Sequence, residues 1–276
     1  MRRTSHKSLF AGIITRMLML LSAFLLLLSY ASMVVNPAKA WYMTILGLLF
    51  VPIAVLNGLF LIMAIKNRSS SFMIPLLALL PSIIFIGRYF QFSSGAEERT
   101  EDTVKILTYN VGHFALGREA EFKSDGGQAT CADSVMSFVR RSGADIVCLQ
   151  EVNLPGEYDV AKYFRKRLPD YHLGYFMFLT DRGSYGNVTL SKFPIVNKGR
   201  LTFDKSSNLA IFTDFKIGEG NVMRVYNCHF ESYNISISRL KKSVREQDGD
   251  MMWETEEKMK KSIRRRPEQV DKVMSD

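Results

Sequence analysis

The distribution of hydrophobic residues changes sharply at about residue 90. Up to that point the sequence holds three long apolar runs, over residues 10–35, 40–64 and 72–90. Each run is long enough to cross roughly 30 Å of bilayer hydrocarbon at about 1.5 Å per residue. The prolines in the second and third runs are tolerated in membrane helices, because neighbouring groups can bond the unpaired backbone atoms. We therefore predict that residues 1–90 form a membrane anchor of three transmembrane helices.

After the anchor, the hydrophobic positions follow the periods of an α/β domain. Residues 91–102 are polar and show no period, which predicts a linker to a domain over residues 103–276. The expected strands are 104–109, 145–149, 171–179, 187–191, 209–217 and 222–230. The expected helices are 129–141, with Val135, Phe138 and Val139 facing inward, 158–168, and charged segments from 235 onward, the last beginning at Pro267. This order predicts sheets packed between helices.

The ionisable residues are distributed as unevenly as the apolar ones. Residues 1–96 contain eight of the 36 Lys and Arg residues and no Asp or Glu, which leaves 28 Lys and Arg against all 27 Asp and Glu in the remainder. The basic character of the chain therefore belongs mostly to the anchor, and it is poor evidence for a nucleic-acid-binding surface elsewhere. In residues 241–266 many basic residues are interleaved with Glu, which favours a solvated helical face; attraction to anionic lipid headgroups is the alternative.

The basic residues near the apolar runs predict the orientation of the anchor. Basic residues precede the first run, and Lys66 and Arg68 lie between the second and third, whereas the loop after the first run carries only Lys39. Because cytoplasmic loops are enriched in Lys and Arg, the N-terminus should lie in the cytoplasm. Three spans then place the rest of the chain on the outer, periplasmic face of the inner membrane. Arg88, at the outer end of the third run, argues mildly against this orientation.

Three of the expected strands end in polar residues that bind metals or transfer protons. Asn110 follows the first strand, Glu151 follows the second, and His229 lies at the end of the last. Strand ends of an α/β sheet gather at one edge, where binding sites form. The carboxylate of Glu151 and the amide oxygen of Asn110 are ligands that suit Mg²⁺. His229 is suited to act as a general base or acid, or to stabilise a developing phosphoryl charge.

Each of these residues also has an ordinary structural explanation. A Glu after a strand is usually a solvated loop residue, an Asn commonly forms a turn, and a single His is often a satisfied polar group. Only the joint pattern at three strand ends indicates a site. His113, three residues after Asn110, and Asn227, in the same strand as His229, are further candidates to line it.

Four segments carry a resemblance to a known family: VKILTYNVGHF, DIVCLQEVN, YGNVTLSKFPIV and RVYNCHFES. In this order they resemble the endonuclease/exonuclease/phosphatase superfamily, of the deoxyribonuclease and exonuclease III-like kind, in a membrane-anchored bacterial form. The resemblance implies that Asn110 belongs to the metal and phosphate site, that Glu151 binds the metal, and that His229 is catalytic. It also implies a four-layer α/β/β/α sandwich and Mg²⁺, or Mn²⁺, as the cofactor.

The sequence departs from the superfamily after Glu231. Two later motifs of the superfamily, G-D-F-N and S-D-H, orient water and phosphate and supply an Asp–His pair, and neither occurs here. The resemblance therefore implies a sandwich that is incomplete at its C-terminus, in a chain truncated before the G-D-F-N strand.

Two functions are consistent with this pattern. The first is a membrane-anchored, metal-dependent phosphoester hydrolase of nuclease, phosphodiesterase or phosphatase type. Its substrate would be a nucleic acid, a phospholipid or a small phosphodiester. The second is a catalytically dead relic or membrane-anchored interaction protein that lacks half of the active site. The sequence indicates no particular protein partner for either.

Overall fold

The computed structural model of the protein describes residues 6–90, 103–115, 131–155, 159–180, 183–204, 206, 208–232 and 237–276. The linker predicted at 91–102, and the first residues of the helices predicted at 129–141 and 158–168, lie outside the described residues. The chain divides into two compact units. One comprises Met1–Glu97 and Tyr233–Glu268, and the other comprises Glu98–Ser232 and Gln269–Asp276.

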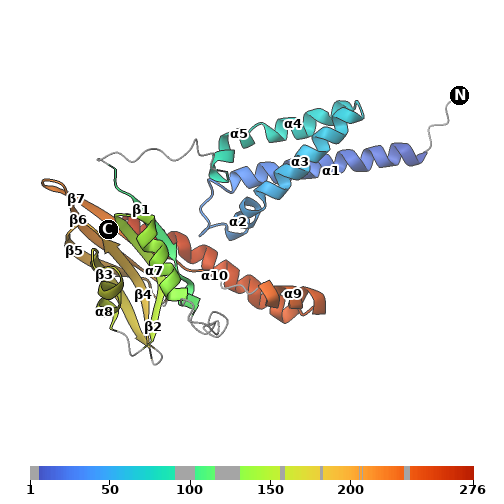
Figure 1. Ribbon diagram of the computed structural model, residues 1–276. Helices are drawn as coiled ribbons and strands as arrows, with labels where there is room; N and C mark the ends of the chain where they lie inside the picture. Colours follow the sequence, from blue (N-terminus) through green and yellow to red (C-terminus); the bar gives the residue numbers. More distant parts are fainter. Residues whose placement is uncertain are drawn as a thin grey trace, which may run out of the picture. The chain divides into compact units, whose positions relative to one another are not determined.

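The first unit begins with apolar helices (Figure 1). They are α1 (His6–Ala31), α2 (Trp41–Leu48), α3 (Phe50–Lys66), α4 (Met73–Leu79) and α5 (Ser82–Phe85), with short 3-10 turns at Ser70–Phe72 and Ile86–Arg88. Gly12–Ala31 and Ser70–Arg88 are each long and apolar enough to cross a membrane. α2 and α3 are bent by 52° where they meet, and they form a third crossing only if the pair acts as one span. The described residues thus hold two or three candidate spans, where the sequence predicts three.

Buried polar side chains connect these helices. Asn57 of α3 is fully buried, and its amide nitrogen donates to the carbonyl and hydroxyl oxygens of Ser22 in α1, at 3.1 and 2.8 Å. The hydroxyl of Tyr30 in α1 donates to the carbonyl of Ala78 in α4 at 2.8 Å. Large apolar side chains such as Ile62 are exposed on the outside of the helices. An apolar interior with a few buried polar contacts between helices, together with apolar side chains on the outside, is the distribution expected of helices surrounded by lipid.

The second unit is built on two β-sheets (Figure 1). The first sheet has the strand order β1 (Ile106–Asn110), β2 (Ile146–Pro155), β4 (Gly183–Ser191), β3 (His172–Thr180), and the second has the order β5 (Ile195–Thr202), β6 (Leu209–Ile217), β7 (Asn221–His229). β1 and β2 are parallel, and every other strand pairing among the described residues is antiparallel. Because Asn110 pairs with Gln150 at the end of the parallel register, the carboxyl end of β1 lies directly beside Glu151.

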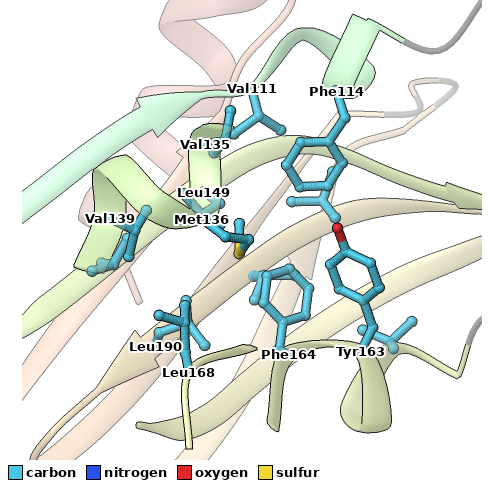
Figure 2. Close-up of a cluster of buried hydrophobic side chains, with 14 of the residues drawn as sticks. Val111, Phe114, Val135, Met136, Val139, Leu149, Tyr163, Phe164, Leu168 and Leu190 are labelled. Carbon is cyan, nitrogen blue, oxygen red and sulfur yellow. The ribbon is translucent and has the colours of Figure 1, made fainter. Parts of the chain in front are cut away.

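Helices α7 (Cys131–Ser142) and α8 (Val160–Arg167) cover one face of the first sheet. Alternation along β2 directs Val147 and Leu149 toward this face. Leu149 packs in one cluster with Val139 of α7 and Phe164 of α8, and all are almost inaccessible to solvent (Figure 2). Burying a side chain of this kind contributes about 1.5–3 kcal/mol, so this core holds β2 firmly against both helices.

The opposite face of the first sheet packs on the second sheet. Ile146 and Cys148 of β2 form a buried cluster with Phe215 of β6. The last residues of α10 (Gly249–Met274), which follows α9 (Ile237–Glu246), also belong to this unit: the side-chain oxygen of Gln269 accepts a hydrogen bond from the backbone N–H of Glu231 at 2.8 Å. The described residues therefore form an α/β sandwich with helices, a mixed sheet and a second sheet. The count of four layers stays a prediction.

Two details of the predicted elements are wrong. The sequence did not predict β5. This strand lies at the edge of the second sheet and most of its side chains are exposed, so its sequence shows little alternation of apolar and polar residues. Pro267 does not begin a helix but lies inside α10. A proline inside a helix removes one N–H from the ladder and its ring crowds the carbonyl four residues earlier, but the helix-forming residues on both sides outweigh this cost.

The inward face of α7 also differs from the prediction. Val135 and Val139 are buried as expected, but Phe138 is 44% exposed and lies edge-on to the ring of Tyr109, with the centroids 5.8 Å apart. Met136 is buried in its place. The buried stripe of the helix is therefore rotated by part of a turn from the one that the sequence predicts.

Candidate functional site

The ends of β1, β2 and β7 bring three polar side chains together around one carboxylate. Oε1 of Glu151 accepts a hydrogen bond from Nδ2 of Asn110 at 2.9 Å and lies 3.1 Å from Nε2 of His229. The Glu151 side chain is 22% exposed and the His229 side chain 14% exposed, so the group lies in a partly desolvated position that solvent still reaches. The three strand-end residues singled out in the sequence are thus direct neighbours in space.

A β-bulge directs Glu151 into this position. The register of β2 against β4 shifts between Leu149 and Val152, and Glu151 has a φ of 55°, in the left-handed region. Leu149 before the bulge and Val152 after it both face the helix-covered core. In a regular strand the side chain at position 151 would point into that core as well; the extra residue turns it toward the strand ends instead. Such a backbone conformation costs on the order of 1–3 kcal/mol for a residue other than Gly, and residues of this kind concentrate at functional sites.

A buried polar network beneath the site fixes the strands to one another. The amide nitrogen of Asn227 donates to the carbonyl oxygens of Leu149 and Val188 at 3.2 and 3.0 Å, and its amide oxygen accepts from Nε2 of Gln150 at 2.8 Å. Gln150 also donates to the hydroxyl of Thr108 at 3.1 Å. Asn227 is 1% exposed, so these bonds replace water that it cannot reach. Each network residue lies one or two positions before a site residue: Thr108 before Asn110, Gln150 before Glu151 and Asn227 before His229.

A left-handed turn after β1 adds His113 to the site. Gly112, His113 and Phe114 have φ values of 53°, 60° and 54°, so three consecutive residues have a left-handed backbone conformation. The backbone N–H of Gly112 donates to Oδ1 of Asn110 at 2.9 Å and begins the turn. The buried Phe114 ring anchors its far end, and Nε2 of His113 lies 3.5 Å from Oε2 of Glu151. His113 thus reaches the second oxygen of the same carboxylate.

The surroundings of His229 favour the neutral form of its imidazole. Burial lowers its pKa below the ordinary value, and the neighbouring Glu151 only partly opposes that effect. Its Nδ1 lies 3.2 Å from the hydroxyl of Tyr185 in β4. Burial, with a contribution from Glu151, raises the pKa of Tyr185 to about 12, so this phenol is protonated at neutral pH. Both ring nitrogens of His229 therefore have a polar partner.

The oxygen atoms of this group are suited to hold one divalent cation. Among the described residues, no group of three or more His, Cys, Asp and Glu side chains forms a metal cage. Mg²⁺ does not require such a cage, because it commonly keeps several waters and binds through one or two carboxylates plus substrate phosphates. Glu151 supplies one carboxylate, and the Oδ1 atom of the exposed Asn110 has a second lone pair beyond the one that accepts from Gly112. The donor set fits a hydrated hard cation.

The structure relates all five predicted site residues to one another. Asn110, Glu151, His229 and His113 meet at the carboxylate, whereas Asn227 lies beneath them in the buried network and does not line the surface. Sequence reasoning did not single out Tyr185, because a tyrosine within a strand is usually a packing residue. It also did not predict that Gln150 joins the buried network; the only sign of this in the sequence is that Gln150 directly precedes Glu151.

Two segments of the chain match the profiles of known families. Residues 107–249, slightly more than half of the chain, match the profile of the Endonuclease/Exonuclease/phosphatase family. The chain belongs to the endonuclease/exonuclease/phosphatase family. The matched region contains Asn110, Glu151 and His229, so the site described above lies within the family domain. Residues 10–89 match a second profile, a domain of unknown function (DUF8431).

Solved structures of the family resemble the chain only distantly. One is a family member from Leptotrichia buccalis, with 17% identity and a TM-score of 0.37; the match covers 52% of this chain and 63% of that one. Another is a family member from Beutenbergia cavernae, with 15% identity and a TM-score of 0.38; the match covers 48% of this chain and 39% of that one. A third is TDP2 from C. elegans, with 18% identity and a TM-score of 0.36; the match covers 67% of this chain and 56% of that one. The chain thus covers less than two thirds of the length of each of these proteins. A comparison with curated proteins gives no match.

Proposed function

We propose that this protein is a metal-dependent phosphoester hydrolase held at a membrane by its N-terminal helices. The observation that carries the proposal is the meeting of Asn110, Glu151 and His229, from the ends of three strands, around a single carboxylate. Membership of a family of nucleases and phosphatases supports it. The nuclease, phosphodiesterase and phosphatase types share this chemistry, and the proposal covers the class.

Each residue of the site has a distinct role in the proposed reaction. Glu151 and Oδ1 of Asn110 would hold Mg²⁺ or Mn²⁺, together with water and the phosphate oxygens of the substrate. When bound, the cation neutralises charge on the phosphoryl group. His229 presents its Nε2 to the same position and stabilises the phosphoryl oxygens or transfers a proton. His113, on the opposite oxygen of Glu151, lines the edge of the site.

The apolar helices would place this chemistry beside a bilayer. Two or three of them are long enough to span it, and the distribution of Lys and Arg favours a cytoplasmic N-terminus. With three spans, the sandwich then lies on the outer, periplasmic face of the inner membrane. A phosphoester at or near that face is therefore the substrate that the protein would meet.

Hydrolysis of bis-(p-nitrophenyl) phosphate by the full chain in lipid nanodiscs tests the proposal. We expect a rate that requires Mg²⁺ or Mn²⁺ and that falls by about 10²–10⁴-fold in His229→Ala, which is the usual contribution of a group that transfers a proton in the transition state. His172→Ala is the matched control, because His172 is an exposed histidine of β3 that has no part in the site. This control should keep the wild-type rate.

Two results would contradict the proposal. Equal rates in the wild type and His229→Ala would remove His229 from catalysis. A folded wild-type protein without divalent-cation-dependent hydrolysis of this diester, or of a phosphomonoester such as p-nitrophenyl phosphate, would favour the alternative of a catalytically inactive, membrane-anchored interaction protein. Circular dichroism of both variants establishes that any loss of rate is not a loss of fold.

A further inference from the structure

Tyr185 occupies the space between the two histidines of the site. Its hydroxyl lies 3.2 Å from Nδ1 of His229, and its ring lies edge-on to the His229 ring, with the centroids 6.4 Å apart and the planes at 68°. On its other side the Tyr185 ring stacks on His113, with the centroids 5.1 Å apart and the planes at 23°. The roles proposed above use His229 and His113, but they give Tyr185 no part.

The hydrogen bonds of His229 leave only one position for its ring proton. Nε2 faces a carboxylate oxygen of Glu151 at 3.1 Å, and an ionised carboxylate can only accept hydrogen bonds. Nε2 must therefore carry the hydrogen. In a neutral imidazole the other nitrogen, Nδ1, is then an acceptor, and the Tyr185 hydroxyl is the donor that faces it. The alternative arrangement, in which Nδ1–H donates to Tyr185, would direct two electron pairs at each other between Nε2 and Glu151.

The geometry points to Tyr185 as a positioning residue that donates its hydroxyl hydrogen to Nδ1 of His229 and so holds the ring with Nε2–H directed at the strand ends. The Tyr185 hydroxyl and the Glu151 carboxylate contact the two ring nitrogens of His229, and the His113 ring stacks on the other side of Tyr185. Tyr185 thus acts through His229.

This arrangement specifies the role of His229 in the proposed hydrolysis. The role inferred here rests on that proposed function. With Nδ1 occupied by Tyr185 and Nε2 protonated, the imidazole presents a hydrogen-bond donor to the position of the substrate. It is therefore arranged to stabilise a phosphoryl oxygen by hydrogen bonding, whereas activation of a water molecule would need an unprotonated nitrogen at that position.

Nitrogen NMR of the full chain tests the assignment without reference to activity. The sequence contains only four histidines, so labelling with ¹⁵N-histidine gives few ring signals, and those of His229 are found by difference from His229→Gln. In lipid vesicles at neutral pH with a chelator, we expect a protonated Nε2 and an unprotonated, hydrogen-bonded Nδ1. In Tyr185→Phe, which keeps the ring stacked on His113, the Nδ1 signal should move to the position of an unbonded nitrogen.

Kinetics distinguish positioning from simple packing. Tyr185→Phe should lower kcat for bis-(p-nitrophenyl) phosphate by about three- to tenfold, the effect of one lost hydrogen bond, and leave KM unchanged. Tyr175→Phe, at an exposed tyrosine of β3, is the control and should change neither constant.

A protonated Nδ1 in the wild type, or an Nδ1 signal that Tyr185→Phe leaves in place, would overturn the assignment. So would an active Tyr185→Phe enzyme with unchanged kcat. If the wild-type chain hydrolyses neither model substrate, the proposed function fails, and the NMR spectra alone still decide whether Tyr185 donates to His229.

Discussion

Nε2 of His229 lies 3.1 Å from Oε1 of Glu151, although the two residues come from different sheets of the sandwich. The same oxygen accepts a hydrogen bond from Asn110, so one carboxylate joins the ends of β1, β2 and β7. The contact requires the sheets to pack at a fixed separation, which the network around Asn227 maintains. The chemistry of the site and the packing between the sheets are therefore directly coupled.

Glu151→Gln should weaken the binding of divalent cations more than any other single change at the site. The substitution keeps the size of the side chain but removes the only carboxylate among the three strand-end residues, and an amide oxygen is a far poorer ligand for a hard cation. Titration calorimetry of Mn²⁺ binding to the full chain in nanodiscs measures this effect. Glu219→Gln, in the exposed turn between β6 and β7, is the control and should bind as the wild type does. Unchanged Mn²⁺ affinity in Glu151→Gln would place the metal elsewhere.

Asn227→Ala should destabilise the sandwich by about 2–4 kcal/mol, because it removes several buried hydrogen bonds, those to Gln150, Leu149 and Val188, at a position that water does not reach. Denaturant unfolding of the full chain, followed by the near-ultraviolet signal of the sandwich, measures the loss. Asn221→Ala, at the exposed start of β7, should change stability by less than about 0.5 kcal/mol. A loss no larger than that of the control would mean that the network does not hold the sheets together.

The stability of the sandwich should decline in acid through Asp214. The hydrogen bonds of the Arg224 guanidinium, at 2.7 and 3.0 Å, hold the pKa of this buried carboxyl below its ordinary value of 3.8. Because the folded-state pKa is the lower one, the contribution is present above pH 3.8 and is lost as the pH falls through the folded-state pKa.

Unfolding of the wild type and of Asp214→Asn at a series of pH values below about 5 measures this contribution. The variant should be less stable than the wild type at the upper end of the series, and the difference should shrink toward the acid end. Asp204→Asn, at an exposed position, should follow the wild type throughout. A constant difference between Asp214→Asn and the wild type would show that the ion pair does not set the pH dependence.

The orientation of the anchor is tested by fusing reporters after Asp276. Alkaline phosphatase, which becomes active only outside the cytoplasm, should be active in this fusion, and a fluorescent protein that matures only in the cytoplasm should remain dark. The physical basis is the excess of Lys and Arg before the first span and between the second and third. The reverse pattern of reporter activity would place the sandwich in the cytoplasm, and it would fit two spans in place of three.

Much of the fold follows from local patterns in the sequence. The strand predicted at 209–217 has the same bounds as β6, and those predicted at 171–179 and 222–230 differ from β3 and β7 by one residue at each end. These segments are predictable because their alternation reports the burial of one face. β5 was not predicted, because most of its side chains face solvent and its alternation is weak. The continuation of α10 through Pro267 was not predicted either, because the residues on both sides of the proline outweigh the missing hydrogen bond.

The sequence by itself determined the family and singled out Asn110, Glu151, His229 and His113 as candidate site residues, because residue type and place at a strand end are local properties. Only the tertiary structure decided how these side chains are arranged around one another. The bulge at Glu151 and the left-handed turn at His113 change side-chain directions in ways that alternation does not predict. The hydrogen bond from Tyr185 to His229 joins residues 44 positions apart, and such a pairing depends on how two sheets pack.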